Sequence, residues 1–97
     1  MNYVAVRSAA ESMAKALWDN PDMRRNLKDV SWNGIREQRD LAENLNWKLA
    51  KELKMMEKWE RDTTENVSDM LLKHVANISD PKKIVPIRES VKTSLFE

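Results

Sequence analysis

The sequence predicts an all-α protein, and three observations lead to that prediction. Residues 35–79 contain neither Gly nor Pro, the residues that most often interrupt a helix. Apolar residues in this stretch recur three and four positions apart, which places them on one helix face. The chain holds one Gly and three Pro, so it has little of the turn chemistry that β-hairpins need. We expect one domain over residues 1–97, a helical bundle or coiled-coil dimer with a shorter N-terminal helix packed on a long central helix.

Composition narrows the class of protein further. Charged residues make up 34% and hydrophobic residues 41% of the chain, proportions typical of a folded domain. The net charge of +1 gives no overall attraction to nucleic acid or to an acidic membrane. The lack of cysteine excludes disulfides and thiolate metal sites. No stretch is apolar for the roughly 18 residues of a membrane span, and residues 1–6 lack a secretory signal pattern, so we expect a cytoplasmic protein without membrane contact.

The first helix is predicted over residues 2–18. Its apolar residues alternate between spacings of three and four, the pattern of a helix packed on a neighbour: Tyr3, Val6, Ala10, Met13 and Leu17. Asn20 before Pro21 ends this helix, because a residue that precedes proline disfavours the helical conformation. The same pair is a helix start signal, so a short second helix is predicted over residues 21–30. Its outer side carries the candidate phosphate contacts Arg24, Arg25 and Lys28.

The long central helix is predicted over residues 35–79. Its apolar stripe would extend for about 65 Å, whereas the helix over residues 2–18 covers only about 25 Å of it. A second copy running antiparallel would cover the remainder, so the sequence predicts a homodimer. The residues of the predicted dimer seam share that stripe: Leu45, Leu49, Leu53 and Met56.

An alternative to one continuous helix lies near residues 62–64. The run from Asp62 to Glu65 resembles a capping box, which marks the start of a helix. Its two adjacent threonines are also weak helix formers. A break there would give a helical hairpin. Because the apolar stripe keeps its phase through Thr63, we expect a continuous helix, with a kink or break at 62–64 as the alternative.

Residues 80–97 are predicted to form a C-terminal arm. Pro81 ends the long helix, and Pro86 favours an extended conformation over residues 82–86. A short helix after Pro86 would place Ile87, Val91 and Leu95 on one face. This pattern fits both an arm docked on the core and a free arm.

The sequence offers no constellation of catalytic or metal-binding residues. Its single histidine, His74, lies on the apolar stripe, where we expect a packed side chain with a hydrogen-bonded partner. A metal site would need three or four ligands, and the serines have no base at helical spacing. One Gly is too few for phosphate-binding or dinucleotide-binding loops. We therefore expect a protein that is not an enzyme and that uses no cofactor.

The side of the long helix opposite its apolar stripe carries the most informative surface feature. Trp47 lies there among cations spaced along the same face: Lys51, Lys54, Lys58 and Arg61. A tryptophan among cations suits a docking surface for an acidic protein patch or a phosphate backbone. The structural alternative is that Trp47 packs against another helix of the same chain.

In size, lack of cysteine and helical pattern, the chain resembles small host-directed proteins of bacteriophages, such as antirepressors and inhibitors of host nucleases. The resemblance is one of type and carries over no residue. With the long seam, it favours a protein-binding regulator or inhibitor that acts by occupying a partner's surface. The alternative is a nucleic-acid-binding regulator that uses the basic face of the long helix. The net charge of +1 and the lack of a clear helix-turn-helix weigh against that alternative.

Overall fold

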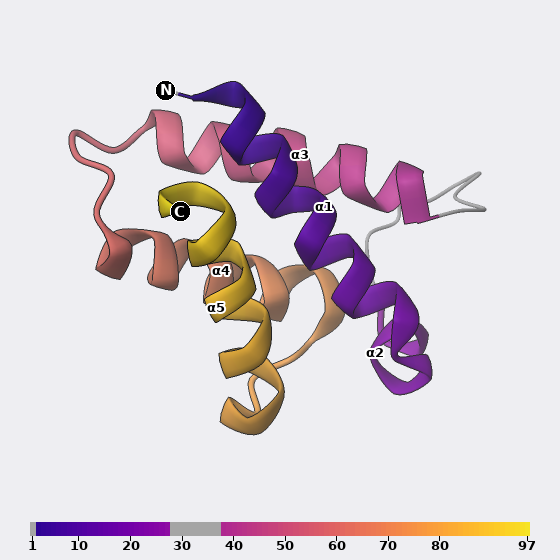
Figure 1. Ribbon diagram of the computed structural model, residues 1–97. Coiled ribbons are helices and arrows are strands. Elements are labelled where there is room, and N and C mark those ends of the chain that lie inside the picture. Colours follow the sequence, from indigo (N-terminus) through magenta and orange to yellow (C-terminus); the bar gives the residue numbers. More distant parts are fainter. Residues whose placement is uncertain (1, 28–37) are drawn as a thin grey trace.

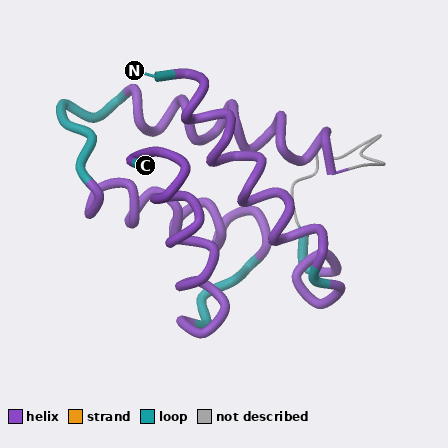
Figure 2. Tube along the Cα trace, in the orientation of Figure 1, coloured by secondary structure: helices purple, strands orange, loops and turns teal. Residues whose placement is uncertain are grey.

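The computed structural model describes residues 2–27 and 38–97, and within these ranges every regular element is a helix (Figures 1 and 2). In chain order the helices are α1 (Tyr3–Asp19), α2 (Pro21–Arg25), α3 (Gln38–Lys54), α4 (Arg61–Ala76) and α5 (Pro81–Phe96). The predicted all-α class is confirmed. In the described part of the chain, none of the helices combines the length and the apolar character that crossing a membrane requires.

Asparagine caps set the limits of the first two helices. The Asn2 side chain accepts hydrogen bonds from the backbone N–H groups of Val4 and Ala5, which α1 cannot satisfy itself. The Asn20 side chain does the same for α2, where Pro21 occupies the first helical position. Helix α2 ends at Arg25 and is therefore shorter than the predicted 21–30. Residues 28–37, which include Lys28 and the first residues of the predicted long helix, lie outside the described residues.

The prediction of one long helix over residues 35–79 is wrong. Helix α3 ends at Lys54, α4 begins at Arg61, and residues 55–60 connect them. The predicted break at 62–64 is also misplaced, because these residues form the first turn of α4. A continuous helix would be about 65 Å long, whereas the longest extent of the molecule is 33 Å.

A hydrogen bond from a tryptophan accompanies the end of α3. The last carbonyl groups of a helix have no partner within it. The indole Nε1 of Trp59 donates to the Leu53 carbonyl oxygen at 3.0 Å, so a residue beyond the helix satisfies one of these groups. The chain turns back there, and the apolar faces of α3 and α4 meet in one core instead of forming one extended stripe.

The predicted extended segment at 82–86 is helical instead. Asn77 adopts a left-handed conformation with φ of 55° and closes α4. Asp80 then caps α5, with Pro81 at its first position. Pro86 lies inside α5 and removes one backbone hydrogen bond. The cap and the burial of the apolar face offset this loss, and α5 docks on the core through Ile84, Ile87 and Val91.

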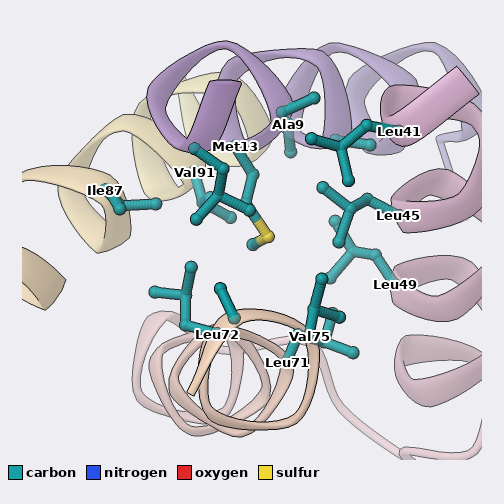
Figure 3. Packing of buried hydrophobic residues seen from close by; sticks show 14 of the residues in the cluster. Ala9, Met13, Leu41, Leu45, Leu49, Leu71, Leu72, Val75, Ile87 and Val91 are labelled. Carbon is teal, nitrogen blue, oxygen red and sulfur yellow. The ribbon is translucent and has the colours of Figure 1, made fainter. Parts of the chain in front are cut away.

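The core gathers one apolar face from each of the four longer helices (Figure 3). Figure 3 shows side chains from all four pointing into one interior: Ala9, Met13, Leu41, Leu45, Leu49, Leu71, Leu72, Val75, Ile87 and Val91. Helix α1 packs most extensively on α3 and next on α5, so the N-terminal helix is the central element. Its buried alanines Ala9, Ala10 and Ala14 let its neighbours approach closely. The Oγ atoms of Ser12 and Ser94 meet at 3.2 Å in the α1–α5 contact.

The residues predicted for a dimer seam lie mainly in this core. Leu45, Leu49 and Leu53 are 0% exposed, and Met56 is half-buried in the connection between α3 and α4. The chain covers its own leucines, because α1 packs along α3 and the chain folds back after Lys54. A second copy could reach these three side chains only if the core opened, so the predicted homodimer is left without this seam.

Candidate functional site

An open groove lies between the N-terminal end of α1 and the C-terminal half of α3. Its volume is about 510 Å³. Figure 1 shows the start of α1 beside the later part of α3, and the groove lies where these two segments meet. We name this feature the α1–α3 groove, and its lining residues are Tyr3, Trp47, Lys48, Ala50, Lys51 and Lys54.

The exposed apolar side chains of the protein concentrate at this end. Of the large apolar side chains exposed in the described residues, only Val85 on α5 lies elsewhere. The others are Tyr3, Val4, Trp47 and Met55. Trp47 is 71% exposed and Tyr3 is 65% exposed. A contiguous exposed apolar area with a polar rim is a frequent mark of an interaction site.

Helix geometry explains why Trp47 faces outward. Leu45, Leu49 and Leu53 are spaced four residues apart and occupy the buried side of α3. Trp47 is two residues after Leu45, about 200° around the helix, and so lies on the opposite side. The alternative in which Trp47 packs inside the chain does not fit its exposure.

Two lysines of the groove have no carboxylate partner in the described part of the chain. Lys51 and Lys54 are exposed, and neither takes part in an ion pair with another described residue. Lys48 is half-buried and has an interaction of its own. The position of Lys51 and Lys54 in the last turns of α3 is favourable in itself, because cations complement the negative end of the helix dipole.

A second hollow continues from the groove toward the connection between α3 and α4. Tyr3 and Lys54 line both hollows, and Trp59 and Glu57 line only the second. The indole of Trp59 is engaged with the Leu53 carbonyl, so this tryptophan serves the fold. Glu57 is exposed and brings a negative charge to this end of the surface.

The structure assembles part of the predicted partner-binding set. Trp47, Lys51 and Lys54 share the groove, whereas Lys58 lies in the connection after α3 and does not line it. Arg61 belongs to another contact, because its guanidinium stacks on Phe96 at 5.1 Å and donates to Glu97 Oε1 at 3.3 Å.

Sequence reasoning missed Tyr3 as a site residue. It was assigned to the apolar seam of the first helix, but the first turn of α1 lies at the end of the core, where Tyr3 remains exposed. Tyr3 is the first residue of the apolar pattern and directly follows the cap Asn2. This position at the end of the helix was the available signal that its side chain would be exposed.

The candidate phosphate contacts on α2 are exposed and have intramolecular partners. Arg24 stacks on Trp18 with its guanidinium carbon 5.2 Å from the ring centre. Arg25 forms an ion pair with Asp22 at 3.0 Å. Arg24 is thus engaged with α1 and Arg25 with its own helix, and neither arginine lines the groove that holds Lys51 and Lys54.

A cluster of four charged residues joins α4 to α5. Both Asp69 carboxylate oxygens accept from Arg88, at 3.2 and 3.1 Å. Glu65 accepts from Arg88 at 2.6 Å and pairs with Lys92 at 3.1 Å. We name Glu65, Asp69, Arg88 and Lys92 the α4–α5 ion cluster. The hydrogen bond with Lys92 holds the pKa of Glu65 below its usual range, and the same bond raises the pKa of Lys92.

The single histidine is exposed, so the prediction of a packed seam histidine is wrong. His74 lies in the last turn of α4, whose buried face is set by Val67, Leu71 and Val75. Thr64, Ser68 and Leu72 are buried as well, so the buried face of α4 is turned away from the line of the stripe on which His74 lies. Among residues 2–27 and 38–97, no three or more histidine, aspartate or glutamate side chains form a group that could hold a metal ion.

Comparison with known proteins found no matching family model, no matching curated protein and no matching solved structure.

Proposed function

We propose that this protein is a small non-enzymatic regulator or inhibitor that binds a partner protein through the α1–α3 groove and acts by occupying that partner's surface. One observation carries the proposal: Tyr3 and Trp47 are exposed side by side in a groove that also holds Lys51 and Lys54. Tryptophan and tyrosine are enriched among the residues that dominate binding energy at protein interfaces.

The burial pattern of α3 supports this proposal. The leucines that hold α3 in the core lie on its other side, so the fold does not depend on Trp47. A large indole exposed to water is costly. Binding a partner would remove that apolar surface from water. This role would explain the exposed indole, because Trp47 takes no part in the packing of the core.

Nucleic-acid binding ranks second. The basic face of a continuous helix, on which that alternative rested, is divided by the break after Lys54. Arg61 is engaged with Phe96 and Glu97, and Arg25 with Asp22. Affinity for a phosphate backbone grows with the number of cations that can contact it. We therefore treat nucleic-acid binding as an outcome to be tested.

Site-specific photo-crosslinking tests the proposal. A photoreactive benzophenone amino acid replaces Met55, which is exposed and follows the groove residue Lys54 directly in the chain. This replacement leaves Trp47 and both lysines in place. The matched control carries the same group in place of Val85, the exposed apolar residue on α5. We expect a protein adduct from position 55 that is absent from position 85.

The adduct alone does not support the proposal, so the captured protein is purified and titrated with the unlabelled chain. We expect Trp47→Ala to weaken that complex by about 2 kcal/mol or more and Val85→Ala to leave it unchanged. A stoichiometric amount of the chain should also reduce the partner's activity. Equal binding by both variants, or adducts only with nucleic acid, would contradict the proposal.

A further inference from the structure

We infer that the α1–α3 groove takes an acidic amphipathic helix of the partner protein. One apolar side chain of that helix would lie between Tyr3 and Trp47, and its carboxylates would pair with Lys51 and Lys54. This inference rests on the proposed function and adds to it the chemistry of the partner.

The floor of the groove selects an apolar anchor. Tyr3 and Trp47 present aromatic surface from two different helices, and Ala50, which also lines the groove, has a small side chain. An aliphatic or aromatic side chain inserted here would contact both rings and remove apolar surface from water. Because the groove is open to solvent, a side chain that a larger partner presents can enter it.

The rim of the groove selects negative charge. Trp47, Lys51 and Lys54 lie on one face of α3, because spacings of four and three residues return to the same side of a helix. They span about 10 Å along the axis, two helical turns. A partner helix lying along α3 would offer carboxylates at a matching interval, three or four residues from its anchor.

The same charges argue against a second copy in the groove. In a two-fold dimer both copies use the same patch, so Lys51 and Lys54 of both copies would enter one interface. Like charges brought together in this way oppose association. Neither lysine is paired with a described carboxylate of its own chain, so both would bring an unneutralised charge to that interface.

A polynucleotide fits the surface less well than an acidic helix. Glu43 is exposed one turn before Trp47 on the same face of α3, and Glu57 lines the second hollow. These carboxylates bound the cationic strip at both ends. A single-stranded nucleic-acid site extends over about four nucleotides or more along a continuous positive groove. The strip from Trp47 to Lys54 is shorter, because it covers only about two helical turns, about 10 Å.

The probes for the test are three side-chain-stapled helical peptides of about 18 residues, long enough for a stable helix. All three carry one tryptophan anchor. The flanking positions hold Glu in the first peptide, Gln in the second and Lys in the third. Binding to the full chain is measured by fluorescence anisotropy at two salt concentrations, with a fluorescent single-stranded oligonucleotide as a further probe. Circular dichroism verifies that each variant is folded.

We expect the Glu peptide to bind about tenfold more tightly than the Gln peptide and the Lys peptide to bind most weakly, with the difference shrinking at high salt. Trp47→Ala should weaken the Glu peptide about 30-fold. The double variant Lys51→Glu with Lys54→Glu should reverse the order of the peptides. The double variant Lys82→Glu with Lys83→Glu changes the net charge equally, on α5, and should retain the order.

Other outcomes overturn the inference in distinguishable ways. Trp47-dependent binding without a charge order would reject the acidic partner and leave the proposed function standing. A lack of binding by every peptide would reject the helix as the occupant, and the crosslinking experiment would then judge the proposed function by itself. Tighter binding of the oligonucleotide than of the Glu peptide would reject both. Self-association that Trp47→Ala abolishes, seen by sedimentation equilibrium, would assign the groove to a second copy.

Discussion

Two charged surfaces of this molecule differ in how their charges are matched. In the α4–α5 ion cluster, two cations meet two carboxylates across a helix pair, and the side chains are largely shielded, with Arg88 at 19% exposure. In the α1–α3 groove, Lys51 and Lys54 stand beside two exposed aromatic rings and have no described carboxylate partner.

The difference separates charges that hold the fold from charges that are available for binding. The charges of the α4–α5 ion cluster pair with one another and so contribute to the docking of α5 on α4. A partner protein would gain little from contacting charges that are already paired. An unmatched strip beside exposed aromatics contributes little to the fold, since exposed charges are well solvated. Stability measurements should therefore respond to changes in the cluster, and binding measurements to changes in the groove.

The largest loss of stability should come from the inward side of the helix that carries the groove. Leu49 is fully buried on α3, so Leu49→Ala leaves a cavity and should cost about 2–5 kcal/mol of unfolding free energy. Chemical denaturation measures this loss. A cost close to zero would mean that α3 is not held by its leucines and that the two sides of α3 have been assigned wrongly.

The next largest effect should come from the ion cluster. Arg88→Ala removes the partner of Asp69 and one partner of Glu65 between α4 and α5. We expect the melting temperature to fall by several degrees, because the partly shielded Asp69 loses its donor and Glu65 keeps only Lys92. Lys54→Ala in the groove is the control and should leave the melting temperature nearly unchanged. Equal effects of the two substitutions would erase the distinction between the surfaces.

A smaller effect should appear at acid pH. The pKa of Glu65 is lowered in the folded state, so its contribution to stability is complete above its unfolded pKa and is lost as the pH falls through the folded value. We expect the protein to lose stability below a pH of about 4.3, the ordinary pKa of a glutamate carboxyl. Glu65→Gln should flatten this part of the stability–pH curve. An unchanged curve would show that Glu65 is not a source of the acid dependence.

The smallest effect on stability should come from Trp47→Ala. Because the indole is 71% exposed, we expect a change in unfolding free energy within about 0.5 kcal/mol. Val85→Ala gives the comparison at an exposed apolar residue outside the groove. A marked drop in melting temperature for Trp47→Ala alone would place the ring in the core and remove the basis of the proposed binding surface.

Local signals in the sequence predicted the class of fold and the caps. Asn20 and Pro21 mark the start of α2 in both the sequence and the structure, because a cap depends only on adjacent residues. The break after Lys54 could not be predicted in this way. It depends on the bond between Trp59 and Leu53, and on the gain from burying both halves of the apolar stripe together. Neither is visible in helical periodicity, which is the same for a straight helix and for two helices in phase.

Only some of the residues of the α1–α3 groove could be predicted from the sequence. Trp47, Lys51 and Lys54 share one helix, so their common face followed from spacing alone. Tyr3 reaches them only through the packing of α1 on α3. The ion cluster joins residues on two helices whose relative placement depends on α5 being a helix from Pro81 onward. A prediction that made residues 82–86 extended could not bring Arg88 and Asp69 together.

The packing of α1 against α5 bears on how the protein is made. Ser12 and Ser94 meet although 82 positions separate them, so α1 leaves the ribosome long before the helix that covers one of its sides. Contacts between such distant segments form late and slow the folding of small domains. The first turn of α1 also supplies Tyr3 to the groove. We therefore expect α1, including its first turn, to reach its final packing only after α5 has been synthesised and has docked.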